Sequence, residues 1–384
     1  METATLIISH YGIGGSLLYL QELASALEKK GYPVIFYLPK NTELGIKNNS
    51  PHKYILKEPS TAPAFLKLKL LKYLFHLSKY FYNAYAVKPE ENIKLAHLLF
   101  PFYLTDLITI LRLKRKGIKV ILTVHEIFPH KPFFGEKIDK KIIKKMYELS
   151  DLLLVHTDSL KKEMLELFSV STEKVRVIAH GYFECPKSPV DTLTLKKKYH
   201  VPLDKKSLLF FGTIRENKGL DILLDAEKDL RDDFFLLIMG QIAGVSETPA
   251  KYYKEIIRKN DLVSSVYWLD KYISADEAAE IFKIADAIIL PYKRSFHAQS
   301  GVLNLAIGYE KPCVVSDVGG IGETVRHYDL GVVVRPEDVQ DLTSGIRTLF
   351  KGKQDFGFVR YKKENNWENV CDKLIGVYEE LLSH

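Results

Sequence analysis

The chain alternates short apolar runs with stretches in which apolar residues recur at helical spacing. The run from Ala4 to Ser9 predicts a buried strand, the leucines between Leu17 and Leu27 predict an amphipathic helix, and Val34 to Leu38 predicts a second strand. A glycine-rich turn separates the first strand from the helix. Strand, turn, helix and strand in this order form a βαβ unit, whose two strands are parallel. The pattern therefore predicts an α/β fold with a parallel sheet.

The same pattern starts again in the second half of the chain. Leu208 to Phe211 reads as a buried strand, and a glycine-flanked polar turn and a helix from Leu220 follow it. Between Glu184 and Pro189 the periodicity is lost, which indicates a domain boundary. We therefore predict two Rossmann-like, doubly wound domains over residues 1–184 and 185–366, and a helix over 367–384 that packs back on the first domain.

The remaining elements follow from the same two periodicities. The predicted helices are 66–85, 104–116, 275–284 and 302–309, and the further predicted strands are 120–124, 152–156, 175–178, 234–239, 266–269, 287–290, 313–316 and 331–334.

Composition narrows the class of protein. Of the 384 residues 46% are hydrophobic and 27% are charged, which is typical of a folded globular chain rather than a disordered one. The three cysteines form no CxxC pair, which favours a reducing compartment and gives no zinc framework. The apolar runs are too short to span a bilayer, and no basic segment precedes the first of them. We expect a cytoplasmic protein without a signal peptide.

The net charge of +7 is concentrated in one region. Residues 60–119 hold eleven Lys and Arg against three Asp and Glu, interleaved with leucines and aromatic residues. This composition predicts a basic face, with Lys67, Lys69, Lys72 and Lys79, that docks on an anionic membrane surface rather than on nucleic acid. A lysine-rich surface that only solubilises the domain is the alternative.

The glycine turn at residues 12–16 is the first candidate binding element. A turn between a strand and a helix lets an anion approach backbone N–H groups at the helix N-terminus. A nicotinamide dinucleotide would require a third glycine where Leu17 stands and an acidic residue where the second strand ends in Leu38-Pro39-Lys40. Both departures disfavour that cofactor, and a tight turn without a ligand remains an alternative.

Two segments of the second half have similar chemistry. Arg215 and Lys218 lie in the turn after a predicted strand, where two cations beside a helix N-terminus are typical of a diphosphate site. Ser300 and Gly301 follow a polar loop and open a helix, which predicts a second cluster of N–H donors. A solvated turn and an ordinary helix start are the alternatives.

Taken together, three stretches resemble the retaining glycosyltransferases of family 4. They are the glycine turn, the stretch FFGTIRENKGLDILLDA from Phe210, and the stretch SGVLNLAIGYEKPCVVSDVGGIGETV from Ser300. The resemblance covers nearly the whole chain. It implies the GT-B fold, in which two Rossmann-like domains face each other across a cleft that holds the active site. It also implies transfer of a sugar from a nucleoside diphosphate to an acceptor hydroxyl, with retention at the anomeric carbon.

The resemblance assigns roles to individual residues. His125, at the end of a strand, would face the transferring sugar, and Arg215 and Lys218 would hold the donor diphosphate. Further donor-binding positions are Gly14 and Gly15 near the phosphates, Tyr272 and Ile273 at the nucleobase, and Gln299, Ser300, Gly301 and Val302 around the second phosphate loop. The acceptor would be a glycan or a lipid-linked or membrane-proximal group, at the inner face of the cell membrane.

One departure separates the chain from most of that family. The two glutamates of the E-x7-E pair fall at His297 and Leu305, and Leu305 cannot bind a ribose hydroxyl. The residues around Gln299 resemble a variant subgroup without the pair, and the ribose contact is left open. No D-x-D sequence occurs, so we expect no metal and no cofactor, with cationic side chains in the role of the metal. A nucleotide-sugar 2-epimerase of the same fold and a non-catalytic nucleotide-sugar-binding subunit remain alternatives.

Overall fold

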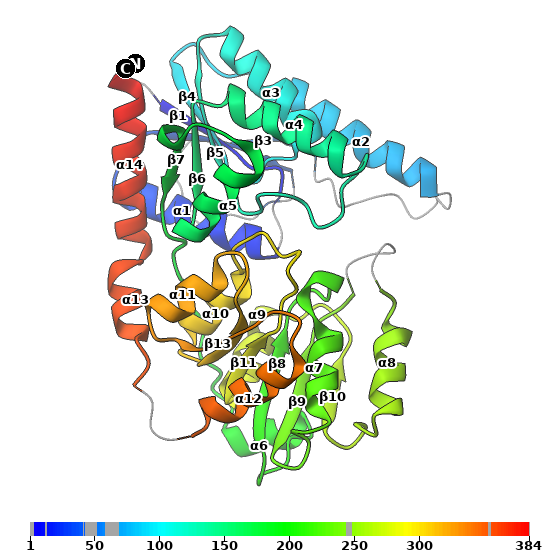
Figure 1. Ribbon diagram of the computed structural model, residues 1–384. Helices are drawn as coiled ribbons and strands as arrows, with labels where there is room; N and C mark the ends of the chain where they lie inside the picture. The colour runs from blue at the N-terminus through cyan, green and yellow to red at the C-terminus, as the bar shows by residue number, and fades with distance from the viewer. Residues whose placement is uncertain are drawn as a thin grey trace. The chain divides into compact units, whose positions relative to one another are not determined.

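In the computed structural model the chain forms two compact units (Figure 1). Unit 1 comprises Met1–Gly181 together with Asn365–His384, and unit 2 comprises Tyr182–Glu364. The structure describes residues 4–11, 14–40, 42, 52–57, 69–242, 248–351 and 355–383. The first two residues of the predicted glycine turn, Gly12 and Ile13, and the predicted surface residue Lys67 lie outside these ranges.

Unit 1 is built on a sheet of seven parallel strands in the order β3-β2-β1-β4-β5-β6-β7. The first strand is buried along its whole length, as its apolar sequence requires in a sheet covered on both faces. The strands are β1 (Ala4–Ile8), β2 (Val34–Pro39), β3 (His52–Leu56), β4 (Ile93–Leu98), β5 (Lys119–Thr123), β6 (Leu152–Val155) and β7 (Val175–Val177).

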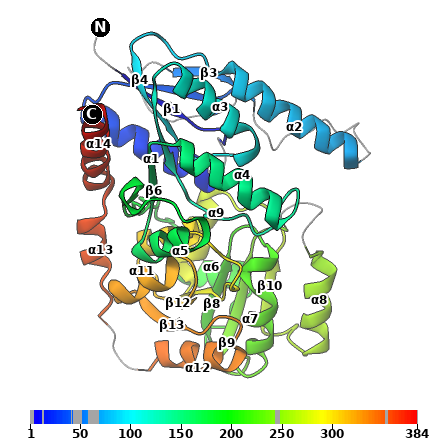
Figure 2. The ribbon, with the colours of Figure 1, turned by 45° about the horizontal axis from the view of Figure 1, so that its top comes forward.

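Six α-helices of the described residues belong to unit 1: α1 (Gly14–Lys29), α2 (Lys69–Ala86), α3 (Tyr103–Arg115), α4 (Glu136–Leu149), α5 (Asp158–Phe168) and α14 (Trp367–Ser383). A short 3₁₀ turn, η1 (Thr172–Lys174), precedes β7. The C-terminal helix α14 lies beside α1 in both ribbon views (Figures 1 and 2). Asp372 pairs with Lys30 at 2.7 Å, and the Tyr378 hydroxyl lies 2.6 Å from Nδ1 of His97 in β4.

Unit 2 has six parallel strands in the order β10-β9-β8-β11-β12-β13. They are β8 (Lys206–Phe211), β9 (Phe234–Met239), β10 (Val266–Leu269), β11 (Ala287–Leu290), β12 (Cys313–Ser316) and β13 (Gly331–Val334). The helices are α6 (Thr192–Lys198), α7 (Leu220–Glu227), α8 (Ala250–Lys259), α9 (Ala275–Ile284), α10 (Gly301–Gly308), α11 (Ile321–His327), α12 (Val339–Leu349) and α13 (Phe358–Glu364), with a 3₁₀ turn η2 (Glu216–Lys218).

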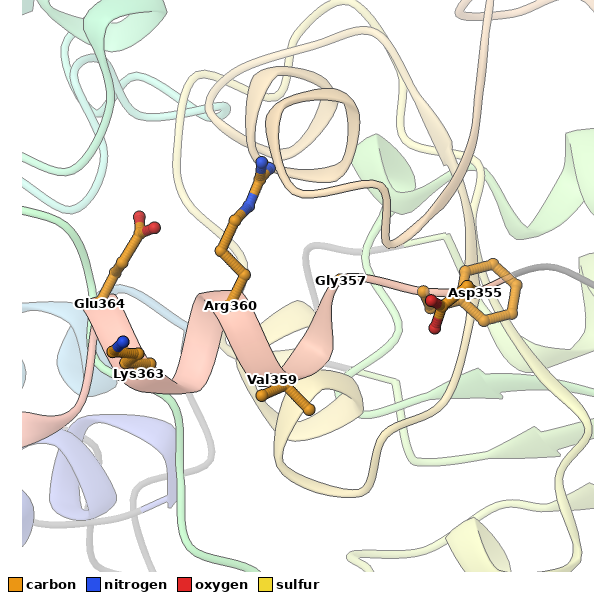
Figure 3. Close-up of a pocket in the computed structure, with 7 residues that line it drawn as sticks. Asp355, Gly357, Val359, Arg360, Lys363 and Glu364 are labelled. Atoms are coloured by element: carbon orange, nitrogen blue, oxygen red, sulfur yellow. The ribbon is translucent and has the colours of Figure 1, made fainter.

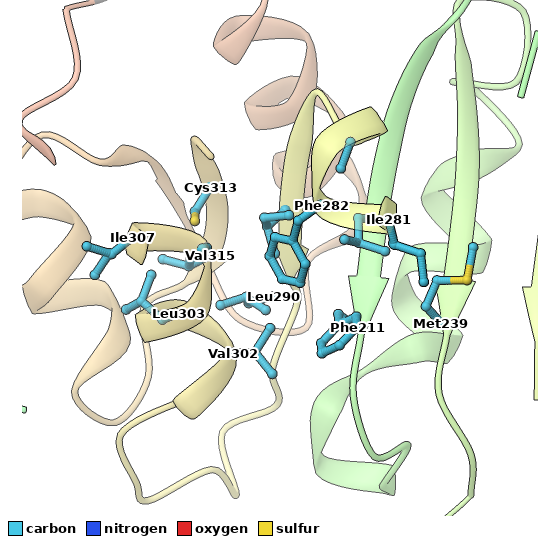
Figure 4. Close-up of a cluster of buried hydrophobic side chains, with 14 of the residues drawn as sticks. Phe211, Met239, Ile281, Phe282, Leu290, Val302, Leu303, Ile307, Cys313 and Val315 are labelled. Carbon is cyan, nitrogen blue, oxygen red and sulfur yellow. The ribbon is translucent and has the colours of Figure 1, made fainter. Parts of the chain in front are cut away.

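Alternate residues of the unit 2 strands enter two different hydrophobic cores. Leu209 and Phe211 of β8 belong to one cluster, whereas Leu208 and Phe210 belong to the other. Because side chains alternate across a strand, both faces of the sheet are covered. Figure 4 shows the first cluster, in which Val302 at the start of α10 lies near Phe211 at the end of β8.

The prediction of two doubly wound parallel sheets is confirmed. In each sheet the strand order reverses once, between β1 and β4 in unit 1 and between β8 and β11 in unit 2. Ligands of such sheets bind outside the carboxyl ends of the strands at this reversal. The sequence pattern missed β3 and β4, and β4 carries Lys94 and His97 within its apolar run. None of the described helices combines the length and apolar character needed to cross a bilayer.

Candidate functional site

The turn after β8 is held in place by two glycines. Gly212 and Gly219 have φ angles of 91° and 66°, in the left-handed region that favours glycine. A Cβ added to Gly219 would lie 2.0 Å from the carbonyl oxygen of Pro291, which follows β11. The backbone N–H of Lys293 also donates to the Asn217 carbonyl. The two loops at the strand-order reversal of unit 2 are therefore joined tightly.

This packing places Lys218 in a half-buried position between the two loops. Its Nζ lies 5.6 Å from the centre of the Tyr292 ring, and a Cβ on Gly212 would come within 3.8 Å of it. Burial, and secondarily the charge of Arg215, lower the pKa of Lys218 to about 7. Arg215 itself is exposed. A cation that has lost much of its hydration without gaining a carboxylate is ready to bind an anion.

The N-terminus of α10 lies next to Lys218. The Tyr292 hydroxyl, beside whose ring Lys218 lies, is 3.2 Å from Oγ of Ser300, and Ser300 caps the helix by accepting from the N–H of Leu303. Within the described part of the chain, no hydrogen bond occupies the N–H groups of Gly301 or Val302. A Cβ on Gly301 would meet no atom of the described residues within 4 Å, so these residues leave room for a ligand at this backbone.

The side chain of Gln299, predicted to bind the donor, already makes two hydrogen bonds within unit 2. Its Oε1 accepts from the N–H of Ser300, and its Nε2 donates to Oγ1 of Thr324. The N–H of Ser300 is therefore already satisfied, and the donors left for an anion are those of the next two residues. Leu305 packs against the core of unit 2, as expected for a leucine at the second position of the glutamate pair.

Tyr272 and Ile273 follow β10, the edge strand on the other side of β9 from β8. Tyr272 is 65% exposed, and Ile273 is half-buried. Ser274 then starts α9 with a capping box formed with Glu277. The two residues are thus on the same edge of the sheet as the turn after β8, because the carboxyl ends of parallel strands share one edge.

In unit 1, Gly14 and Gly15 form the first turn of α1, directly after β1. A Cβ on either would meet no atom of the described residues within 4 Å. One turn further along α1, the buried Tyr19 contacts the His125 ring edge-to-face, with centroids 4.8 Å apart. The structure thus brings the helix of the glycine turn and the predicted sugar-facing histidine together.

His125 follows β5 and lies in an aromatic environment. Its ring stacks on Phe100 with centroids 4.3 Å apart and an interplanar angle of 10°. Nδ1 lies 3.1 Å from Nε2 of His156. Nε2 of His125 is buried, and within the described residues no hydrogen-bond partner reaches it. Burial, with smaller contributions from neighbouring histidines, lowers the pKa of His125 well below its usual value, so the ring is neutral near pH 7.

Sequence reasoning missed the histidines that surround His125. His156 follows β6, His180 comes soon after β7, and their ring centroids lie 5.1 Å apart. Burial lowers the pKa of His156 to about 4 and that of His180 to about 3. A signal was present: several strands of the first half are closely followed by a histidine, and their carboxyl ends meet at one edge.

His10, at the end of β1, forms a second buried network. Its Nε2 lies 2.8 Å from Oδ1 of Asp106 in α3, and its Nδ1 lies 3.3 Å from the Asn83 side-chain nitrogen in α2. The side-chain amide of Asn83 also bonds both backbone groups of Lys57. This network connects three elements around the start of the glycine turn.

Not every lysine that was predicted on the exposed face of the basic segment, residues 60–119, is exposed. Lys79, predicted as one of its exposed lysines, is buried, with 8% of its surface exposed, and lies 5.1 Å from the centre of the Phe75 ring. That prediction is wrong, because the alkyl stem packs into the domain. The side chains of Lys69 and Lys72 are outside the described set. Among the α2 side chains that the structure describes, Leu74, Phe81, Tyr82 and Tyr85 are large, apolar and exposed.

An open pocket of about 540 Å³ lies beside α13 (Figure 3). It is lined by Asp355, Phe356, Gly357, Val359, Arg360, Lys363 and Glu364. The Arg360 guanidinium donates to the His327 carbonyl and lies 5.0 Å from the centre of the Tyr328 ring. None of the predicted donor-binding residues lines this pocket, so the candidate site is defined by the loops after β8 and β11 instead.

Comparison with known protein families gives two matches. The family described as Glycosyltransferase Family 4 matches residues 13–182, and the family described as Glycosyl transferases group 1 matches residues 191–369. The first match lies in unit 1 except for its last residue, and the second covers most of unit 2 and the start of α14.

Among curated relatives, an uncharacterised glycosyltransferase of Methanocaldococcus jannaschii, MJ1607, is 26% identical over 249 residues. That match covers 61% of this chain and 60% of the relative, so less than two thirds of the relative's length is spanned.

Among solved structures, sucrose-phosphate synthase of Thermosynechococcus elongatus has a TM-score of 0.74 at 18% identity and is covered completely, as is this chain. HepE of Anabaena, solved with UDP and glucose, has a TM-score of 0.73 at 16% identity, with 98% of this chain and 99% of HepE covered. These likenesses confirm the GT-B fold class. The two family matches, one in each half of the chain, support a glycosyltransferase of the family 4 type.

Proposed function

We propose that this protein transfers a hexose from a nucleoside-diphosphate sugar to an acceptor hydroxyl, with retention at the anomeric carbon, in the biosynthesis of a polysaccharide, glycolipid or other glycoconjugate. The observation that carries the proposal is the position of Lys218. It is a desolvated cation that no carboxylate of the described residues pairs with, and it lies next to the open N-terminus of α10. A diphosphate between them would satisfy the cation and the two N–H groups at once.

The same groups supply the chemistry that departure of a diphosphate needs. Negative charge develops on the oxygens of the leaving diphosphate as the bond between the sugar and the diphosphate breaks. In this proposal Arg215, Lys218 and the N–H groups of Gly301 and Val302 stabilise that charge. The closeness of Lys218 to Tyr292 and the open space at Gly301 support this role. Removal of one such contact costs roughly 10²–10³ in rate. Gly14 and Gly15 at the start of α1, which the family resemblance assigns to the donor phosphates, belong to the same proposal.

In this proposal Nε2 of His125, which is buried and has no hydrogen-bond partner among the described residues, accepts a hydrogen bond from a hydroxyl of the transferring sugar. Tyr272 and Ile273 receive the nucleobase at the edge strand of unit 2. The ribose contact comes from a residue other than position 305, because the leucine there packs into the core. The lack of the glutamate pair would place the chain in a variant subgroup of its family.

Uridine nucleotides are the first donors to test, since HepE was solved with UDP and with UDP-glucose. A thermal-shift screen of UDP, GDP, ADP and their sugars measures binding, because a ligand of the folded state raises the melting temperature. Binders are then incubated with the protein alone and with candidate acceptors. Slow hydrolysis of the sugar nucleotide and transfer to an acceptor support the proposal, whereas binding without any turnover contradicts it.

The two alternatives make different predictions in the same assay. An epimerase would convert the donor to its 2-epimer without an acceptor, and a binding subunit would return the donor unchanged. Neither is favoured, because both matching families are glycosyltransferase families.

We further propose that the transfer needs no divalent metal or cofactor. The diphosphate is expected to be neutralised by side-chain cations and backbone donors, which replace the metal of other glycosyltransferase folds. Activity should survive EDTA. Loss of activity with EDTA and rescue by Mg²⁺ or Mn²⁺ would show that the donor site uses different chemistry.

For the acceptor, we propose a lipid-linked or membrane-proximal group reached from an anionic membrane surface on the cytoplasmic side. The exposed residues Leu74, Phe81, Tyr82 and Tyr85 fall on one helical face of α2. The Lys57 ammonium lies 4.1 Å from the centre of the Tyr82 ring, so a cation accompanies this face. Aromatic residues with adjacent cations are typical of a helix that lies at the headgroup boundary.

Co-sedimentation with phosphatidylglycerol vesicles tests this surface. Binding should rise with anionic lipid, fall at high salt, and weaken when Leu74 and Tyr85 are changed to Ser. The matched control is Val359→Ser, which removes a similarly exposed apolar residue from unit 2. Wild-type protein that stays in the supernatant with fully anionic vesicles at low salt would indicate a soluble acceptor.

A further inference from the structure

The ring nitrogens of His156 connect a backbone carbonyl to His125. Nδ1 of His156 lies 3.0 Å from the Ile178 carbonyl oxygen, and Nε2 lies 3.1 Å from Nδ1 of His125. A carbonyl oxygen can only accept, so Nδ1 of His156 must carry a proton. All of these groups belong to unit 1, and the His156 ring is 5% exposed.

The proton on Nδ1 of His156 determines which nitrogen of His125 carries a proton. Burial lowers the pKa of His156 to about 4, so near pH 7 the ring holds a single proton. With the proton on Nδ1, Nε2 of His156 is a lone-pair acceptor, and the contact at 3.1 Å requires a donor on the other side. His125 must therefore carry its proton on Nδ1. Because His125 is also neutral, its Nε2 is left unprotonated.

We propose that His156 is a positioning residue that fixes the tautomer of His125, so that the buried Nε2 of His125 presents a lone pair to a hydroxyl of the transferring sugar. The role of that hydroxyl rests on the proposed function, whereas the proton arrangement rests only on the contacts in unit 1. The neighbours agree with a fixed ring, because Phe100 stacks on one face of His125 and Tyr19 contacts its edge. A buried acceptor without a partner is costly, and a ligand hydroxyl would satisfy it.

Nitrogen NMR of the full chain measures the tautomer directly. With ring-¹⁵N-labelled histidine near pH 7, the His125 signals are assigned by their loss in His125→Asn. We expect Nδ1 of His125 in the protonated range and Nε2 in the unprotonated range. A proton on Nε2 of His125 in the wild type overturns the inference.

Two substitutions of His156 separate positioning from packing. The amide of His156→Gln can still accept from His125 and donate to the carbonyl, and should keep the tautomer. His156→Leu removes both bonds, and should release the proton from Nδ1. In the transferase assay we expect His156→Leu to lower kcat by about tenfold to hundredfold, the size seen when an orienting partner is lost, with partial rescue by His156→Gln. The same tautomer in His156→Leu as in the wild type would overturn the inference.

His97→Gln is the matched control for loss of a buried histidine. The two ring nitrogens of His97 contact the hydroxyls of Tyr378 and Thr123, at 2.6 and 2.7 Å, rather than His125. The His97→Gln substitution should therefore lower the stability of the protein without changing the His125 tautomer. Failure of the two proposals is distinguishable: an active enzyme with the proton on Nε2 of His125 overturns this inference alone. A protein with the expected tautomer that transfers no sugar supports the inference and contradicts the proposed function.

Discussion

Replacing Lys218 with methionine should stabilise the folded protein while it weakens donor binding. The pKa of Lys218 is about 7 in the folded state and 10.5 in the unfolded chain. Because folding lowers the pKa of a basic group, the charged form is penalised at every pH below the unfolded value. The full shift corresponds to about 4 kcal/mol at pH 7, and partial exposure of the side chain reduces this to about 1–3 kcal/mol.

The assay is urea unfolding of wild type and Lys218→Met at two pH values. The penalty is fully present below pH 7 and fades as the pH rises toward 10.5, so the stabilisation should be large at pH 6.5 and smaller at pH 9.5. Turnover should fall by roughly 10²–10³ in the same variant.

Lys293→Met is the matched control on the adjoining loop. The Lys293 ammonium pairs with Asp221 at 2.7 Å, so its removal should stabilise nothing and should leave donor binding intact. If the free energy of unfolding of Lys218→Met at pH 6.5 is no higher than that of Lys293→Met, Lys218 is not a desolvated cation. If it retains full turnover, the diphosphate lies elsewhere.

Three further outcomes follow from the same structure. Binding of a nucleoside diphosphate should weaken up to about tenfold per pH unit above pH 7, because Lys218 must take up a proton, and calorimetry in two buffers of different ionisation enthalpy would detect that uptake. Glu227→Gln should raise the free energy of unfolding by roughly 1–3 kcal/mol at pH 8 and little at pH 4. Burial raises the pKa of Glu227 to about 8, so at pH 8 the carboxyl group ionises more fully in the unfolded chain, which favours unfolding. Equal effects at both pH values would refute this. Gly219→Ala should cost roughly 2–4 kcal/mol through strain and the approach to Pro291, whereas Gly376→Ala, in open space on α14, should gain about 0.5–1 kcal/mol; thermal unfolding that ranks them equally would contradict the geometry.

The sequence by itself determined most of the strands and the order of the candidate binding turns along the chain. Short apolar runs have no stable alternative to burial between helices, so the two doubly wound sheets followed from periodicity. The turn with Arg215 and Lys218 and the start of α10 could also be located, since glycines and cations after a buried strand are local signals. β4 was missed because Lys94 and His97 interrupt its apolar run, and only pairing with β1 and β5 makes it a central strand.

Only the tertiary structure decided which of these groups interact and in which protonation state. The lowered pKa of Lys218 arises from packing between loops about seventy residues apart, and Lys79, which was expected on an exposed face, is buried. His125 and His156 are separated along the chain and meet only because adjacent parallel strands end at one edge of the sheet. Hydrogen-bond partners and desolvation depend on distances in space, and a periodic pattern of residues carries no record of them.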